Sequence, residues 1–71
     1  MDIFTVYVIR YWRLDDYVPE LEEFGSDRER AESTYNRTPV TPDTPQIELC
    51  RYSVSKKFGC VVDTEILRFK E

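Results

Sequence analysis

The C-terminal third of the chain is dominated by β-forming residues on either side of a glycine-containing turn, and this pattern predicts a β-hairpin. The runs QIELCRYSVS and CVVDTEILRFK flank the residues KKFG. If Gly59 takes the left-handed position of a three-residue loop, Lys56 faces Cys60. The facing pairs are then Ile47–Phe69, Glu48–Arg68, Leu49–Leu67, Cys50–Ile66, Arg51–Glu65, Tyr52–Thr64 and Val54–Val62. Apolar residues face apolar residues and charges face opposite charges, which favours this register over its neighbours.

A second β pattern, IFTVYVIRYWRL, opens the chain from Ile3 to Leu14. It is rich in β-branched and aromatic residues, and both of its faces are apolar over the first half, as in a strand that is central or covered on both sides. We expect the face that carries Phe4, Val6 and Val8 to contact a helix.

The region between these strands predicts one helix. Ser26 followed by Glu29 fits a capping box, so we expect a helix from about Asp27 to Asn36. Its apolar stripe consists of Ala31 and Tyr35, which Phe24 joins from before the cap. Upstream of this helix, Pro19 followed by ELEEF and a glycine predicts a short helical turn.

The segment TPVTPDTP, from Thr38 to Pro45, follows the helix and predicts a stiff extended connector, because Thr-Pro steps recur every three residues. The elements together predict an α+β fold with β-α-β-β order. We expect a small single domain over residues 1–71, with a three-stranded, mainly antiparallel sheet and one helix packed on one face. If the crossover is right-handed, the third strand lies between the other two.

The composition argues against catalysis. The chain has no histidine and only two glycines, so it lacks the usual general base, the commonest metal ligand and a glycine-rich phosphate loop. In the predicted hairpin Cys50 and Cys60 lie three pairs apart, roughly 20 Å, which is too far for a disulfide. We expect two reduced cysteines, no cofactor, no metal site and no enzymatic activity.

The N-terminus lacks the pattern of a signal peptide, and no apolar run approaches the length of a membrane span. A cytoplasmic protein without membrane contact is therefore expected.

The net charge of −4 is unevenly distributed. Residues 15–32 hold eight carboxylates and two arginines, a net charge of −6 within about a quarter of the chain. Such a segment is either a solvated face that keeps a small domain soluble or a docking surface for a basic or nucleic-acid-binding protein. The docking hypothesis assigns partner contacts to Asp15, Asp16, Glu20, Glu22, Glu23, Asp27 and Glu29.

A second candidate surface lies at the open end of the predicted hairpin. Ile47, Leu49, Leu67 and Phe69 share one face in the expected register. Because a single helix covers only one face of the sheet, we expect these residues to form an exposed apolar patch. The patch is either a second contact with a foreign partner or the seam of a homodimer.

Aromatic and basic residues alternate along the strand between Tyr7 and Arg13, and this alternation supports an alternative function. Aromatic rings stack on nucleic-acid bases and cations hold phosphates, so Tyr7, Arg10 and Trp12, with Lys57, are candidates for binding a single strand. Ordinary strand packing explains the same residues equally simply.

In size, acidic charge and strand–helix–hairpin plan, the chain resembles the small accessory proteins that phages encode to bind host or defence proteins. The resemblance implies a non-catalytic inhibitor that acts in the host cytoplasm through its acidic surface.

Overall fold

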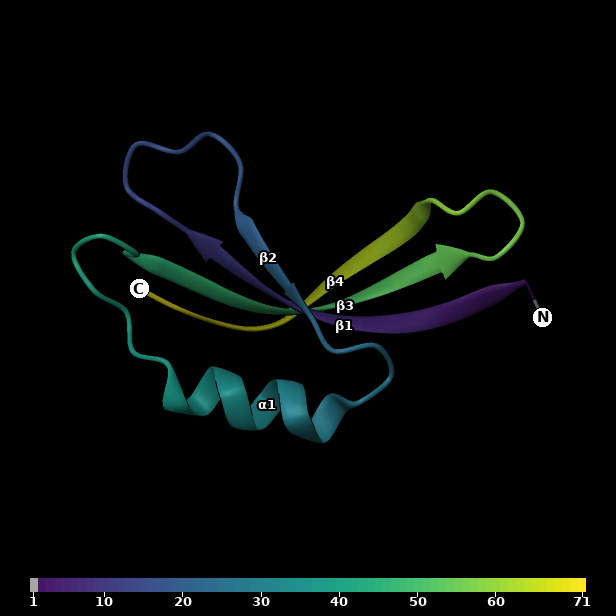
Figure 1. The fold of residues 1–71 in the computed structure, drawn as a ribbon, viewed down its shortest axis with the longest axis horizontal. Helices are drawn as coiled ribbons and strands as arrows, with labels where there is room; N and C mark the ends of the chain where they lie inside the picture. The colour runs from purple at the N-terminus through teal and green to yellow at the C-terminus, as the bar shows by residue number, and fades with distance from the viewer. Residues whose placement is uncertain (1) are drawn as a thin grey trace.

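The computed structural model describes residues 2–71. The elements are β1 (Ile3–Trp12), β2 (Glu20–Glu23), α1 (Arg28–Arg37), β3 (Gln46–Ser55) and β4 (Val61–Lys70). The strands form one sheet in the order β2-β1-β3-β4, and every neighbouring pair is antiparallel. Figure 1 shows α1 alone on one side of the sheet, so the α+β class and the single covered face are confirmed. The expectation of three strands is wrong, because there are four.

The additional strand is β2, in the segment expected to form a helical turn. Its four residues pair with β1, and the ladder continues past its end, since the Phe24 amide donates to the Tyr7 carbonyl at 2.9 Å. A helix this short satisfies few of its own backbone groups, whereas the free edge of β1 offers partners for the groups of β2 that point towards it. Gly25, with a φ of +59°, ends the pairing in the left-handed conformation that glycine adopts without strain.

Strand β1 lies in the interior of the sheet, with β2 on one side and β3 on the other. It pairs with β3 over ten residues, from Ile3–Ser55 to Trp12–Gln46. The predicted placement of the last strand between the other two is therefore wrong, and β4 is an edge strand. The central position explains why both faces of β1 are apolar, since neighbouring Val8 and Ile9 are both fully buried.

The predicted hairpin register is confirmed for the pairs Cys50–Ile66, Arg51–Glu65 and Tyr52–Thr64, and for Ser53–Asp63, which the same register implies. Near the turn an irregularity pairs Val54 with Val61 instead of Val62. At the other end a second irregularity pairs Ile47, Glu48 and Leu49 with Lys70, Phe69 and Arg68, so the expected pairs there are wrong.

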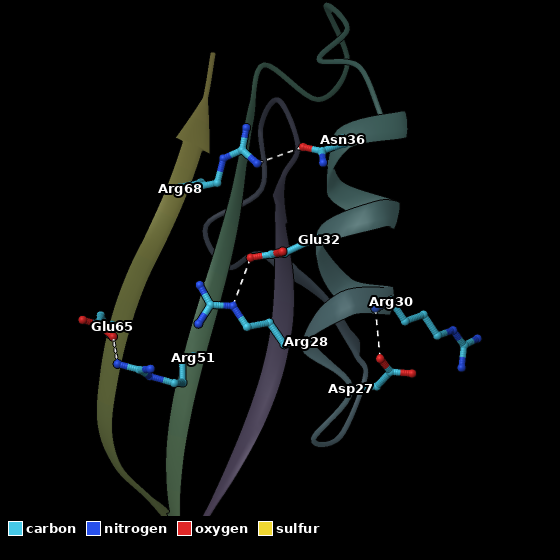
Figure 2. Close-up of polar contacts among 8 residues, drawn as sticks. All are labelled: Asp27, Arg28, Arg30, Glu32, Asn36, Arg51, Glu65 and Arg68. Atoms are coloured by element: carbon cyan, nitrogen blue, oxygen red, sulfur yellow. Dashed lines mark hydrogen bonds and ion pairs between the residues drawn. The ribbon is translucent and has the colours of Figure 1, made fainter.

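The irregularity at the end of β4 brings two cations to the C-terminal end of α1. Lys70 Nζ donates to the Tyr35 carbonyl at 2.6 Å, and Arg68 donates to the Asn36 side-chain oxygen at 3.0 Å. Figure 2 shows Arg68 reaching from β4 towards Asn36. The last carbonyls of a helix carry partial negative charge, which favours cations there. The same shift moves Phe69 to the side of the sheet away from α1.

The core lies between α1 and the sheet. Ala31 and Tyr35 pack against Ile9, Ile47 and Leu49, and all five are buried. The apolar stripe of the helix is confirmed, as is the contribution of Phe24. The odd-numbered residues of β1 and β3 therefore face the helix.

This arrangement corrects two expectations. The face with Phe4, Val6 and Val8 does not contact α1. The expected exposed patch of Ile47, Leu49, Leu67 and Phe69 does not form either, because Ile47 and Leu49 are in the core and Leu67 is half-buried against it. Phe69 alone of these four is exposed, at 62%.

The helix begins one residue later than expected, and Asp27 is its cap instead of Ser26. The Asp27 carboxylate accepts a hydrogen bond from the Arg30 amide at 3.0 Å, as Figure 2 shows. A carboxylate is favoured at this position because it also faces the positive end of the helix dipole. After α1 the proline-rich connector is not straight, since Thr41 and Thr44 close a turn through reciprocal backbone hydrogen bonds of 3.1 Å.

Candidate interaction surface

Among residues 2–71, no helix or strand covers the side of the sheet opposite α1, and we call this side the open face. Its residues follow from the strand registers, because facing residues share a side and alternate along each strand. They are Phe4, Val6, Val8, Arg10, Trp12, Leu21, Glu23, Gln46, Glu48, Cys50, Tyr52, Val54, Val61, Thr64, Ile66 and Phe69.

One half of the open face is an apolar groove of about 450 Å³. It is lined mainly by Phe4, Val6, Leu21, Tyr52, Val54 and Val61. Phe4, Leu21 and Val61 are each between 42% and 48% exposed, so this apolar surface is accessible to a partner.

The other half holds a charged network around Glu48. Its carboxylate accepts hydrogen bonds from Arg10 Nε at 2.8 Å and from Trp12 Nε1 at 2.5 Å, and Glu48 is only 5% exposed. The Arg10 guanidinium also lies 6.0 Å from the centre of the Trp12 ring. The positive and negative charges of this half therefore neutralise each other within the molecule.

The thiol of Cys50, which neighbours this network, is a poor nucleophile. Burial raises the pKa of the Cys50 thiol, and the nearby Arg10 only partly opposes this shift. The buried thiol is therefore protonated near neutral pH, where a thiol is a poor nucleophile. Cys60 is exposed at the hairpin turn, and both cysteines are free, as expected.

The two sides of the sheet differ where α1 does not reach. On the helix side the uncovered part carries Ile3 and, besides it, Thr5, Ser53, Asp63 and the Arg51–Glu65 ion pair drawn in Figure 2. These polar side chains suit contact with water. The open face is apolar at the same level of the strands, and exposed apolar surface of this kind marks interaction sites.

The edges of the sheet are poor sites for adding a strand. The edge strand β2 is short and acidic, with the sequence ELEE, and the edge strand β4 has a register irregularity towards each end. Charges, short length and bulges each hinder pairing with another chain. The face of the sheet, and not an edge, is therefore the better contact surface.

The structure does not gather the predicted acidic residues into one cluster. Asp15 and Asp16 lie in the loop between β1 and β2, three glutamates lie on β2, and Asp27 and Glu29 lie at the start of α1. All seven are exposed.

Several of these carboxylates have intramolecular partners. Arg13 Nε donates to Glu20 at 2.7 Å and lowers the pKa of Glu20 through this hydrogen bond. The Tyr11 hydroxyl donates to Glu22 at 2.6 Å; burial, together with this bond, raises the pKa of Tyr11 to about 12. The segment is thus less negative towards a partner than its sequence suggests.

The candidates for nucleic-acid binding are also separated. Tyr7 packs on the helix side, with the Arg28 guanidinium 6.0 Å from the centre of its ring. Arg10 and Trp12 lie on the open face and are engaged by Glu48, while Lys57 lies in the hairpin turn at the far end of β3. The structure does not bring these four residues into one site.

The open face was not predicted as a site from the sequence, although the sequence contains one signal for it. Both faces of β1 are apolar, yet one helix of ten residues covers only one of them. The second apolar face, with Leu21, Tyr52 and Ile66 beside it, therefore required a separate explanation.

In the part of the chain that the structure describes, no group of three or more Cys, Asp or Glu side chains is placed to hold a metal ion. Among the same residues, no helix has the length and apolar character needed to cross a membrane. No protein-family model, curated protein or solved structure matches the chain.

Proposed function

We propose that this protein is a non-catalytic protein-binding module whose contact surface is the open face. The observation that carries the proposal is the difference between the two sides of the sheet. Beyond the reach of α1 the helix side is mainly polar, with Ile3 as an apolar exception, whereas the open face exposes 49% of Ile66 and 62% of Phe69 to water.

The composition of the open face suits a protein partner. Burying one side chain such as Phe69 or Ile66 against a partner contributes roughly 1.5–3 kcal/mol. The face also carries Phe4, Trp12 and Tyr52, and aromatic residues are enriched at the centres of protein interfaces. These side chains stand on a hydrogen-bonded sheet, so little ordering is needed when a partner binds.

The acidic residues have a supporting role in this proposal. Within residues 2–71, no side-chain hydrogen bond or ion pair engages Asp15, Asp16 or Glu23. Exposed charges at the margin of an interface mainly accelerate association with a partner of opposite charge. A module of this kind acts by occupying a surface of its partner, as the resemblance to phage-encoded inhibitors implies.

Site-specific photo-crosslinking tests the proposal. Ile66 and Ile3 are a matched pair, because they are the same residue type, 49% and 44% exposed, on opposite sides of the sheet. Each is replaced in turn by p-benzoylphenylalanine, and the protein is irradiated in the cells that produce it. We expect discrete protein adducts from position 66 and few from position 3.

The adducts are identified by mass spectrometry. Adducts that are equal at both positions, or that favour position 3, would refute the open face as the contact surface. The identity of an adduct from position 66 shows whether the occupant is a foreign protein or another copy of this chain.

A further inference from the structure

The two ends of the open face carry opposite charges. The loop 13–19 joins β1 to β2 at one end, and the turn 56–60 joins β3 to β4. Because β1 and β3 are antiparallel, the loop and the turn lie at opposite ends of the sheet, along the 41 Å axis of the molecule. Figure 1 shows both of them rising on the side of the sheet away from α1.

The loop 13–19 is acidic and apolar. Asp15 and Asp16 are exposed, and Asp43 is held beside them because its carbonyl accepts a hydrogen bond from the Leu14 amide at 2.9 Å. Tyr17 and Val18 in the same loop are 97% and 74% exposed.

The turn 56–60 is basic and apolar. Lys56 and Lys57 are exposed, and Phe58 between them and Gly59 is 74% exposed. Asp2 is held next to this turn, because its backbone carbonyl accepts a hydrogen bond from the Lys56 amide at 2.7 Å. Counting Lys56, Lys57 and Asp2, the turn end has a net charge of +1; counting Arg13, Asp15, Asp16 and Asp43, the loop end has a net charge of −2.

We propose that the occupant of the open face is a second copy of this chain, bound face to face with its long axis reversed. This inference rests on the proposed function and specifies its partner. In the dimer the basic turn of each copy contacts the acidic loop of the other, so the same contact occurs twice.

Two face-to-face dimers with two-fold symmetry are possible, and the charges at the two ends of the open face favour the one with reversed long axes. Two identical faces stack about a two-fold axis that lies in the plane between them. An axis along the strands would place acidic loop against acidic loop. An axis across the strands places loop against turn, and like-charge repulsion disfavours the first choice.

The centre of the face suits contact with itself. The Arg10–Glu48 pair is satisfied within each copy, so in the reversed arrangement it brings no unpaired charge against the apolar groove of the other copy. Glu23, the remaining charged residue of the face, lies on the edge strand β2. Packed sheets stand about 10 Å apart, a distance that large side chains such as Phe4, Tyr52 and Phe69 span from both sides.

Sedimentation of the purified chain with charge reversals tests the inference. The turn variant combines Lys56→Glu with Lys57→Glu. The loop variant combines Asp16→Lys with Asp15→Asn, because Asp15 has a φ of 71° that asparagine tolerates better than lysine does. We expect a dimer for the unaltered chain and a dimer Kd about tenfold higher for each variant.

The combined variant provides the decisive comparison, since it restores opposite charges at both contacts. We expect it to dimerise more tightly than the turn variant alone, and circular dichroism confirms that each variant is folded. The reversed arrangement is wrong if the fold-increase in the dimer Kd of the combined variant equals the product of the fold-increases of the two separate variants. It is also wrong if either variant alone leaves the dimer Kd unchanged.

The matched pair of face variants tests the surface itself. Ile66→Lys is expected to be monomeric, while Ile3→Lys dimerises like the unaltered chain. A purified chain that is monomeric at all concentrations overturns the dimer. If position 66 then crosslinks foreign proteins in cells, the proposed function stands without the dimer.

Discussion

Glu48 shows how a single residue fixes the character of the open face. It is the one carboxylate buried on this face, and two donors from β1, Arg10 and Trp12, reach it. These hydrogen bonds hold the Trp12 ring over this half of the sheet, and the pairing of Arg10 with Glu48 leaves no unpaired charge there. Because the guanidinium retains some exposure, with 19% of the Arg10 side chain accessible, its pairing is worth less than that of a fully buried ion pair.

We expect Glu48→Gln to lower the free energy of unfolding by about 2–4 kcal/mol, since it leaves the Arg10 charge largely desolvated without its partner. The matched control is Glu65→Gln, whose ion pair with Arg51 is 39% and 51% exposed at its side chains. An exposed pair contributes less than about 1 kcal/mol. Urea titration at one protein concentration measures both losses.

A further variant separates charge from packing. Arg10→Met combined with Glu48→Met leaves no unpaired charge, so most of the stability lost in Glu48→Gln should return. Equal losses for the Glu48 and Glu65 variants would mean that the buried network has no special energetic role.

At the scale of elements, the sequence predicts those features that depend on neighbouring residues or on directly facing strand pairs. The four central pairs of the hairpin follow from apolar and charge matching, and the position of α1 follows from its capping pattern within one residue. The register near Arg68 and Lys70 cannot be predicted in this way. Matching of facing pairs takes no account of the Asn36 side chain and the Tyr35 carbonyl at the end of α1, which accept hydrogen bonds from these two cations.

The strand β2 and the covered side of the sheet were mispredicted for a related reason. The segment ELEE is too short to distinguish the helical repeat of apolar residues from the two-residue repeat of a strand. It forms a strand because the edge of β1 is available to pair with it. The side that α1 covers could not be read from β1, where both faces are apolar. It depends on how Ile9, Ile47 and Leu49 meet across the sheet, which requires the β1–β3 register.

The cap of α1 gives a prediction at the same scale. Asp27→Ala should lower the free energy of unfolding by about 1 kcal/mol, because it removes the acceptor of the Arg30 amide and a favourable charge at the helix N-terminus. Ser26→Ala is the matched control, one residue away, and should change stability by less than about 0.5 kcal/mol. Denaturant titrations that reverse this order would assign the cap to Ser26.

At the scale of the whole molecule, a small core and a large uncovered face are linked. The five residues of the buried cluster lie on one side of a sheet that spans the length of the protein. A chain of 71 residues buries only about 60% of the surface that it exposes when unfolded, so its stability is modest. Association through the open face would add buried apolar surface that the monomer lacks, and folding and dimerisation would then be thermodynamically coupled.

Coupling of this kind predicts that the melting temperature depends on protein concentration. For a dimer that unfolds to monomers, about a hundredfold increase in concentration stabilises the folded dimer by roughly 2.7 kcal/mol, which corresponds to a rise of about 5–10 °C. Calorimetry of the unaltered chain and of Ile3→Lys should show this rise, whereas Ile66→Lys should melt at one temperature throughout. A melting temperature of the unaltered chain that is independent of concentration would mean that its stability does not depend on a second copy.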